Sequence, residues 1–170
     1  MDSILQTLER LNKSGVEYVL IGGMAARVHG SSVNTDDVDI CILARDEHFQ
    51  RIVESFADVH PRFRMQPNQP PVTPDHPWLS GIKNLYLHTD LGQLDVLGEL
   101  PGIGGYEAIR DRTVAVDLDA TPCRVLDIPT LIEAKQHAGR PKDHQAILEL
   151  QYILSRIEDS NQAEREISGD

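Results

Sequence analysis

Asp37 and Asp39 have the residue type and the spacing needed to hold a divalent cation. They lie two residues apart in a segment where Val38, Ile40 and Ile42 alternate with polar or small residues. This period of two predicts a strand from which both carboxylates project on one face. Carboxylate oxygens are the ligands that Mg²⁺ and Mn²⁺ prefer. Two carboxylates on an exposed strand are more often simply solvated, however, so the pair alone does not establish a metal site.

A third candidate, Asp95, comes from a different part of the chain. It lies in the apolar run of residues 93–97, which is typical of a strand. A charge in such a strand needs a partner, because burying an unpaired carboxylate is costly. That partner is either a cation shared with the first two aspartates or a basic side chain of the sheet, such as Arg124 or Lys83.

A glycine pair precedes the first two aspartates. Gly22 and Gly23 follow the apolar run of residues 18–21, which predicts a buried strand that turns sharply into a helix over residues 24–29. Glycine lets a backbone approach a ligand closely, and the free N–H groups at the start of a helix favour an anion. Gly22, Gly23 and Met24 are therefore candidates for binding a triphosphate. The alternative is a tight turn that needs glycine only for a positive φ.

The elements around these residues predict one α/β domain. Hydrophobic spacing indicates helices over residues 2–13, from Asp46 to before His60, and over 129–138 and 141–157. Asp46 is the expected N-cap of its helix. Further strands are expected at residues 84–88, 93–97, 114–116 and 124–126, the first two forming a hairpin. We expect a mixed sheet flanked by helices with a C-terminal helical pair, a domain over residues 1–158, and a polar, disordered tail over 159–170.

Residues 61–81 contain prolines at six positions, too many for a regular element. This segment is predicted to be a long loop or an excursion over the surface. Long loops often carry function, and both a lid and a partner surface are possible roles.

Composition limits the classes of function. The 170 residues carry a formal net charge of -11, so the molecule as a whole repels nucleic-acid backbones. Cys41 and Cys123 each lie in an apolar context, which favours buried, reduced thiols over a disulfide. The chain shows neither a signal-peptide pattern nor an apolar stretch long enough to span a bilayer. We therefore expect a cytoplasmic protein that does not associate with a membrane.

The order of these motifs resembles the nucleotidyltransferase superfamily of DNA polymerase beta-like proteins. The matching features are Gly22-Gly23, His29-Gly30, Thr35-x-Asp37-Val-Asp39 and a later strand with Asp95 between apolar residues. Within that superfamily, the additional Lys135 and the run Gly139-Arg-Pro-Lys-Asp143 are similar to small bacterial AbiEii-type nucleotidyltransferases. The resemblance spans residues 18–150.

The resemblance implies a phosphoryl transfer that uses two Mg²⁺ or Mn²⁺ ions and moves a nucleoside monophosphate from a nucleoside triphosphate to a hydroxyl. Asp37 and Asp39 would hold both metals. Asp95 would hold the metal on the acceptor side and help to take the proton of the hydroxyl. The acceptor stays open among an RNA end, a protein and a small molecule.

The resemblance also places Thr35, Lys135, Arg140, Lys142 and Asp143 at the nucleotide. Lys135 and Arg140 would neutralise the leaving pyrophosphate or contact the base and ribose. Each residue has an ordinary alternative: the cations can serve solubility or the helix dipole, Asp143 can be a first-turn acid, and Thr35 can satisfy backbone groups of its loop.

Two other hypotheses about the function remain open. One is a catalytically weak or inactive nucleotide-binding regulatory module, such as the antitoxin-type partner in a toxin–antitoxin pair. Its motivation is the small size of the chain and Val33, which stands where members of the AbiEii-type group often carry arginine. The other is an α/β protein whose aspartates are only surface charges.

Overall fold

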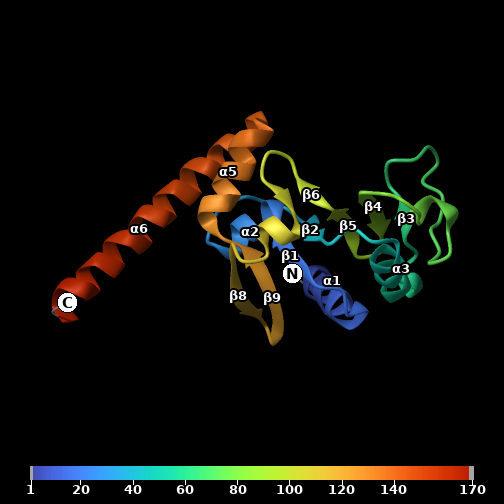
Figure 1. Cartoon of the computed structure of the whole chain (residues 1–170), viewed down its shortest axis with the longest axis horizontal. Coiled ribbons are helices and arrows are strands. Elements are labelled where there is room, and N and C mark those ends of the chain that lie inside the picture. Colours follow the sequence, from blue (N-terminus) through green and yellow to red (C-terminus); the bar gives the residue numbers. More distant parts are fainter. Residues whose placement is uncertain (1, 169–170) are drawn as a thin grey trace.

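A seven-stranded mixed sheet forms the centre of the molecule in a computed structural model that describes residues 2–168 (Figure 1). The strand order is β3-β4-β5-β2-β1-β9-β8, and a separate two-stranded ribbon joins β6 to β7. The strands are β1 (Tyr18–Ile21), β2 (Val38–Ile42), β3 (Arg62–Phe63), β4 (Asn84–Thr89), β5 (Gly92–Leu97), β6 (Glu99–Leu100), β7 (Gly104–Gly105), β8 (Thr113–Leu118) and β9 (Thr121–Leu126).

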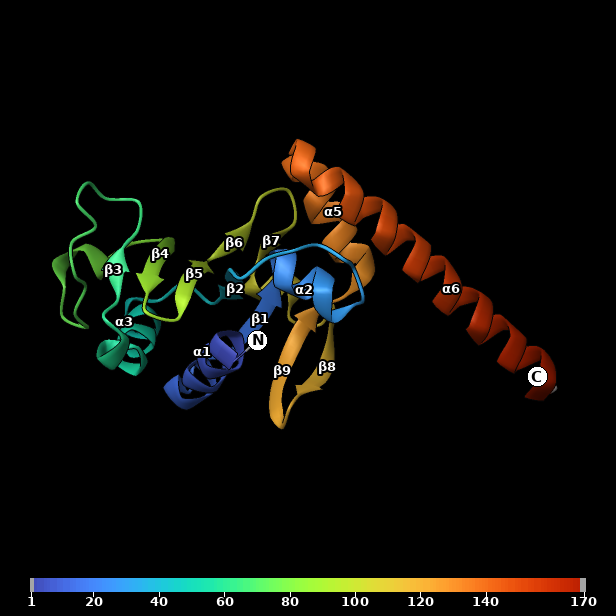
Figure 2. The same cartoon turned by 180° about the vertical axis from the view of Figure 1, so that it is seen from behind.

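The helices pack on both sides of this sheet. They are α1 (Asp2–Ser14), α2 (Gly22–Val28), α3 (Asp46–Ser55), α4 (Tyr106–Ile109), α5 (Ile128–Ala138) and α6 (His144–Ser168). In both views α1 and α3 lie next to each other in the lower half of the molecule, and α5 lies in the upper half beside the start of α6 (Figures 1 and 2). The far half of α6 projects away from the body.

Alternation along the strands and helical spacing in α1 and α3 create a single core. Leu8 and Phe49, one from each of these helices, are fully buried, as are Leu20 and Ile40 on the paired central strands. Cys41 and Cys123 are both buried and free, as the apolar contexts predicted. The mixed sheet, its flanking helices and the 84–97 hairpin are therefore confirmed.

Three local expectations are corrected by the structure. Asp46 is the first residue of α3, and Arg45, with an extended backbone, is its N-cap; the Asp46 carboxylate instead accepts hydrogen bonds from Ser80 Oγ and the Gly81 N–H. The proline-rich segment is not wholly irregular: β3 adds an edge strand to β4, and residues Pro77–Leu79 form a 3₁₀ turn. The predicted tail is helical from residue 159 to Ser168 as the end of α6, and residues 169–170 lie outside the described chain.

Among residues 2–168, every helix is too short or too polar to cross a bilayer.

Candidate active site

Two of the predicted carboxylates lie side by side at the centre of the sheet. Asp39 on β2 is the direct partner of Asp95 on the parallel strand β5. Tyr86 on β4 is opposite Asp95, and Ile21 on β1 is opposite Asp39. Because paired residues on neighbouring strands project to the same face, these four side chains form one row across the sheet.

Gly22 directly follows Ile21 of this row and is the first residue of α2. Its φ of +67° belongs to the left-handed region, and a Cβ at this position would stand 2.1 Å from Oδ2 of Asp39. The N–H of Gly23 donates to the Asp39 carboxylate. The glycine pair therefore makes room for an aspartate and binds it, so the Gly23 N–H is already used and is not free for a phosphate.

Asp39 is in an environment that disfavours its negative charge. Burial raises its pKa to about 6, and the neighbouring Asp95 and Asp37 carboxylates add to this effect. The Gly23 N–H and Arg140 act in the opposite direction but do not cancel it. A partly buried cluster of carboxylates with this excess of negative charge is a favourable place for a cation.

Asp95 has a basic partner from the proline-rich segment. The guanidinium of Arg64 forms an ion pair with its carboxylate, and both side chains are only about one-fifth exposed. Arg64 also lies over the ring of Tyr86, 5.6 Å from its centroid, and its own Nε is buried without a hydrogen-bond partner. The predicted alternative of a salt bridge for Asp95 is thus realised by Arg64, and not by Arg124 or Lys83.

Lys135, Asp143 and Arg140 form a second charged group beside the row. Nζ of Lys135 lies 3.0 Å from one oxygen of Asp143, and Nε of Arg140 lies 2.6 Å from the other. Lys135 and Asp143 are nearly fully buried, whereas the Arg140 side chain is about half exposed. Burial alone would raise the pKa of Asp143, but hydrogen bonds from Arg140 and Lys135 outweigh it and hold the pKa below its ordinary value.

The two groups face one another across a single pocket of about 530 Å³. Asp39, Asp95 and Gly22 line one side, and Lys135 and Arg140 from the α5 end line the other. Apolar residues of the β5–β6 region and α5 complete the wall, among them Leu97, Leu100 and Leu131. The pocket is therefore acidic on the sheet and basic on the helix, with apolar walls between them.

Three solved structures share this architecture. The lincosamide antibiotic adenylyltransferase LnuA, bound to lincomycin, aligns with a TM-score of 0.64 at 17% identity, over 90% of this chain and 97% of its own. The antibiotic-resistance factor ANT(2'')-Ia aligns with a TM-score of 0.55 at 12% identity, over 98% and 95%. An antigenic nucleotidyltransferase-like protein from Paracoccidioides brasiliensis aligns with a TM-score of 0.51 at 16% identity, over 95% and 87%.

The chain has the nucleotidyltransferase fold. At these identities the likeness concerns the fold alone. No protein-family model matches the sequence, and no curated protein matches it significantly.

Not every predicted residue of this nucleotidyltransferase-fold site lines the pocket. Asp37 is exposed just before β2, where its N–H is 3.2 Å from the Thr35 hydroxyl, although its charge still reaches Asp39. Thr35 packs against Gly23 and accepts a hydrogen bond from Arg27 through its carbonyl, as expected for a loop-shaping residue. The Met24 side chain is buried in the core, and Lys142 is exposed outside the pocket lining.

The loop before β2 is held by a residue that sequence reasoning missed. Glu149 on α6 accepts hydrogen bonds from the Ser31 and Ser32 hydroxyls, each 2.6 Å away, and from the Ser32 N–H at 2.8 Å. Together with a bond from Gln145, these contacts lower the pKa of Glu149 to about 2. The Ser31-Ser32 pair, although of loop composition, gave no indication of its distant partner.

The side chains around Asp39 fit a divalent cation in their chemistry. Carboxylate oxygens are hard ligands, and the absent Cβ of Gly22 leaves the Asp39 carboxylate room at the pocket. Within residues 2–168, however, no three His, Cys, Asp or Glu side chains are already grouped as a metal site. Arg64 takes up one oxygen of Asp95, so a cation bound by all three aspartates would have to compete with this guanidinium.

Proposed function

We propose that the chain is a metal-dependent nucleotidyltransferase that moves a nucleoside monophosphate from a nucleoside triphosphate to a hydroxyl acceptor. The observation that carries this proposal is the direct pairing of Asp39 and Asp95 on adjacent strands, facing Lys135 and Arg140 across one pocket. Acidic groups for a cation and basic groups for phosphates are thus on opposite walls of a space large enough for a ligand.

Each side of the pocket has its own part in the proposed reaction. A Mg²⁺ or Mn²⁺ ion held by Asp37, Asp39 and Asp95 would neutralise phosphate charge and make the acceptor hydroxyl more acidic. Arg140, half exposed at the pocket, would bind the phosphates. Lys135 is buried against Asp143 and positions Arg140 through that shared carboxylate. Asp95, whose strand partner is Tyr86, would accept the proton of the acceptor hydroxyl.

A nucleotide-binding module without transfer activity is the second candidate. The Arg64–Asp95 ion pair and the exposed position of Asp37 favour it, because both are compatible with a pocket that binds a nucleotide but holds its cation weakly. The AbiEii-type and toxin–antitoxin associations rest on the order of sequence motifs alone.

Transfer is tested with the full chain, Mg²⁺ and α-³²P-labelled nucleoside triphosphates, in the presence of a panel of hydroxylated acceptors. ATP is tried first because LnuA is described as an adenylyltransferase. We expect pyrophosphate release and a labelled product, both lost in Asp39→Asn and Asp95→Asn.

Thermal stabilisation by a non-hydrolysable ATP analogue with Mn²⁺ separates the two candidates. Stabilisation without pyrophosphate release for any nucleotide would favour the binding module. No stabilisation would refute both candidates, and stabilisation unchanged in the double variant Asp37→Ala plus Asp39→Ala would refute the metal-dependent transfer.

A further inference from the structure

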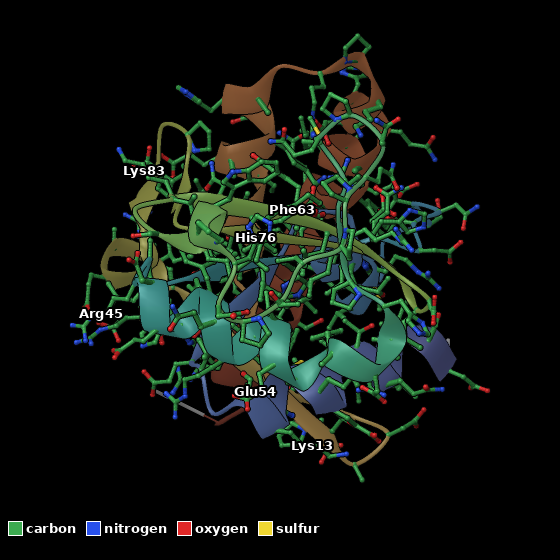
Figure 3. All side chains as sticks on the ribbon, turned by 90° about the vertical axis from the view of Figure 1, so that its right-hand side faces the viewer. Lys13, Arg45, Glu54, Phe63, His76 and Lys83 are labelled. Carbon is green, nitrogen blue, oxygen red and sulfur yellow. The ribbon has the colours of Figure 1, made fainter. Side chains whose placement is uncertain are left out.

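The proline-rich segment folds into an aromatic cluster at the edge of the sheet. The rings of Phe63, His76 and Trp78 contact one another, with centroid separations of 4.8, 5.3 and 4.9 Å for the three pairs. Figure 3 shows Phe63 and His76 next to each other at this edge. Phe63 is buried, whereas Trp78 is 51% exposed. The cluster therefore holds a tryptophan in a defined position with part of its surface open.

This open tryptophan surface belongs to a second pocket of about 300 Å³. Its wall includes Met65 and Ile82, and the polar side chains among its lining residues are the uncharged Gln66, Asn84 and Tyr86. Met65 is 63% exposed, so two large apolar side chains face solvent at one place. Exposed apolar groups that gather at a concave surface mark a binding site more often than scattered ones do.

Tyr86 connects this apolar pocket to the catalytic pocket, because it lines both. On its strand it is the direct partner of Asp95. Arg64 lies over the same ring, and its guanidinium also contacts Sδ of Met65 at 3.7 Å. A molecule that packs against Trp78 and Met65 is therefore next to Tyr86 and Arg64, the two residues that contact or pair with Asp95.

We propose that the apolar pocket is the acceptor subsite and takes an uncharged, partly apolar small molecule that carries a hydroxyl. This inference rests on the proposed nucleotidyl transfer. The acceptor oxygen forms a bond to the α-phosphorus of the triphosphate, and the bond from that phosphorus to the pyrophosphate oxygen breaks. The proton of the hydroxyl passes to Asp95, and pyrophosphate leaves with the electron pair.

The charges around the pocket select this class of acceptor. A nucleic-acid acceptor needs Lys or Arg side chains for its phosphates, but the lining residues are uncharged and the neighbouring Arg64 is already paired with Asp95. The formal net charge of -11 further opposes an RNA. A polycation, in turn, would find no carboxylate among the lining residues.

Trp78 is the only tryptophan in the sequence, so its fluorescence reports on this pocket directly. We would titrate the full chain with phenyl β-D-glucoside, an uncharged molecule that combines an aromatic ring with hydroxyls. A saturable change in Trp78 emission is expected. Met65→Glu should weaken binding at least about tenfold, because the carboxylate would be desolvated by the ligand. Tyr152→Glu is the matched control, since Tyr152 is 66% exposed on α6, which lies at the other end of the molecule (Figure 1).

Three outcomes would overturn the inference: no saturable change in emission, a change that is the same in Met65→Glu, or a short single-stranded RNA binding in place of the glucoside. Because Met65 is on the surface, circular dichroism can confirm that Met65→Glu folds. If the glucoside fails while ATP analogue and Mn²⁺ stabilise the chain, only the subsite is wrong. If the glucoside binds and the nucleotide does not, the proposed transfer is wrong, and with it the role of the pocket as an acceptor subsite.

Discussion

Gly22 and Asp39 are so close that a Cβ at position 22 would stand 2.1 Å from the carboxylate oxygen of Asp39. The backbone of Gly22 also has a positive φ of +67°, which costs other residues energy. We therefore predict that Gly22→Ala lowers the free energy of unfolding by about 3 kcal/mol, from strain and overpacking together, and displaces Asp39. Urea denaturation and Mn²⁺ binding measure the two effects.

Gly81 is a matched control for this substitution. Its φ of +71° is similar, but a Cβ there would meet nothing within 4 Å. Gly81→Ala should cost only about 1 kcal/mol and leave Mn²⁺ binding unchanged. Equal effects of the two substitutions on Mn²⁺ binding would show that the contact with Asp39 has no role in the site.

Arg64→Gln should have opposite effects on stability and on cation binding. The cation-free protein loses the ion pair to Asp95, and we expect a decrease of about 1–2 kcal/mol in the free energy of unfolding. Mn²⁺ no longer competes with the guanidinium, so its affinity should rise roughly tenfold. Calorimetric titration with Mn²⁺ measures this change.

The neighbouring Arg62 provides the comparison, because it is exposed and its guanidinium donates a 3.3 Å hydrogen bond to the Gln69 carbonyl instead of pairing with a carboxylate of the site. Arg62→Gln removes the same formal charge from the segment. If it raised Mn²⁺ affinity as much as Arg64→Gln does, the effect would come from net charge and not from the ion pair.

Substitutions of the buried Lys135 and of the half-exposed Arg140 should have different effects, the first mainly on stability and the second mainly on ligand binding. Lys135→Met leaves the buried Asp143 with one partner, and we expect a loss of roughly 3 kcal/mol in unfolding free energy. Arg140→Gln should cost about 1 kcal/mol or less, but should weaken binding of a fluorescent ATP analogue at least about tenfold.

Lys142→Gln tests the remaining sequence-based assignment to the nucleotide site. Lys142 is exposed outside the pocket lining, so the structure favours a small effect on nucleotide affinity. A loss as large as that of Arg140→Gln would restore Lys142 to the site.

The hydrogen bonds to Glu149 make the stability of the Ser31-Ser32 loop depend on pH. They lower the pKa of Glu149 from its ordinary value of 4.5 to about 2 in the folded protein. A depressed carboxylate pKa stabilises the fold above the unfolded value of 4.5, and this contribution is lost as the pH falls toward 2. Glu149→Gln should therefore lower Tm at pH 7 by more than it does at about pH 3.

Glu158→Gln, on the exposed part of the same helix, should leave Tm unchanged relative to the wild type at both pH values. The prediction for Glu149 fails if the difference in Tm between Glu149→Gln and the wild type is independent of pH.

The fold was largely predictable because its elements follow from local patterns. Alternation at Val38, Ile40 and Ile42 marks β2, and Pro129 marks the start of α5, where Asp127 provides the N-cap through the Thr130 N–H. The adjacency of Asp39 and Asp95 could not be predicted from such local patterns. It depends on the order of strands in the sheet, which hydrophobic periodicity does not specify.

The parts of the site that were missed involve partners far apart in sequence. Arg64 lies in a proline-rich segment without periodicity, so nothing local indicated that it would reach Asp95. Lys135 looked like an exposed cation near a helix end, but Asp143 allows it to be buried. Glu149 is more than a hundred residues from the serines that it binds. Such pairings follow from tertiary packing and have no signature in a short window.

The acidic residues on the sheet side of the pocket and the basic residues on its helical side also come from different parts of the chain, and the acidic ones are synthesised first. Asp39 and Asp95 leave the ribosome before Lys135 and Arg140, because domains are synthesised from the N-terminus. Both carboxylates of the sheet are therefore synthesised before the basic groups of the opposite wall. Arg64, which pairs with Asp95 in the folded protein, is also synthesised before Asp95. The ion pair that a bound metal would have to displace thus joins two residues that are both synthesised before α5.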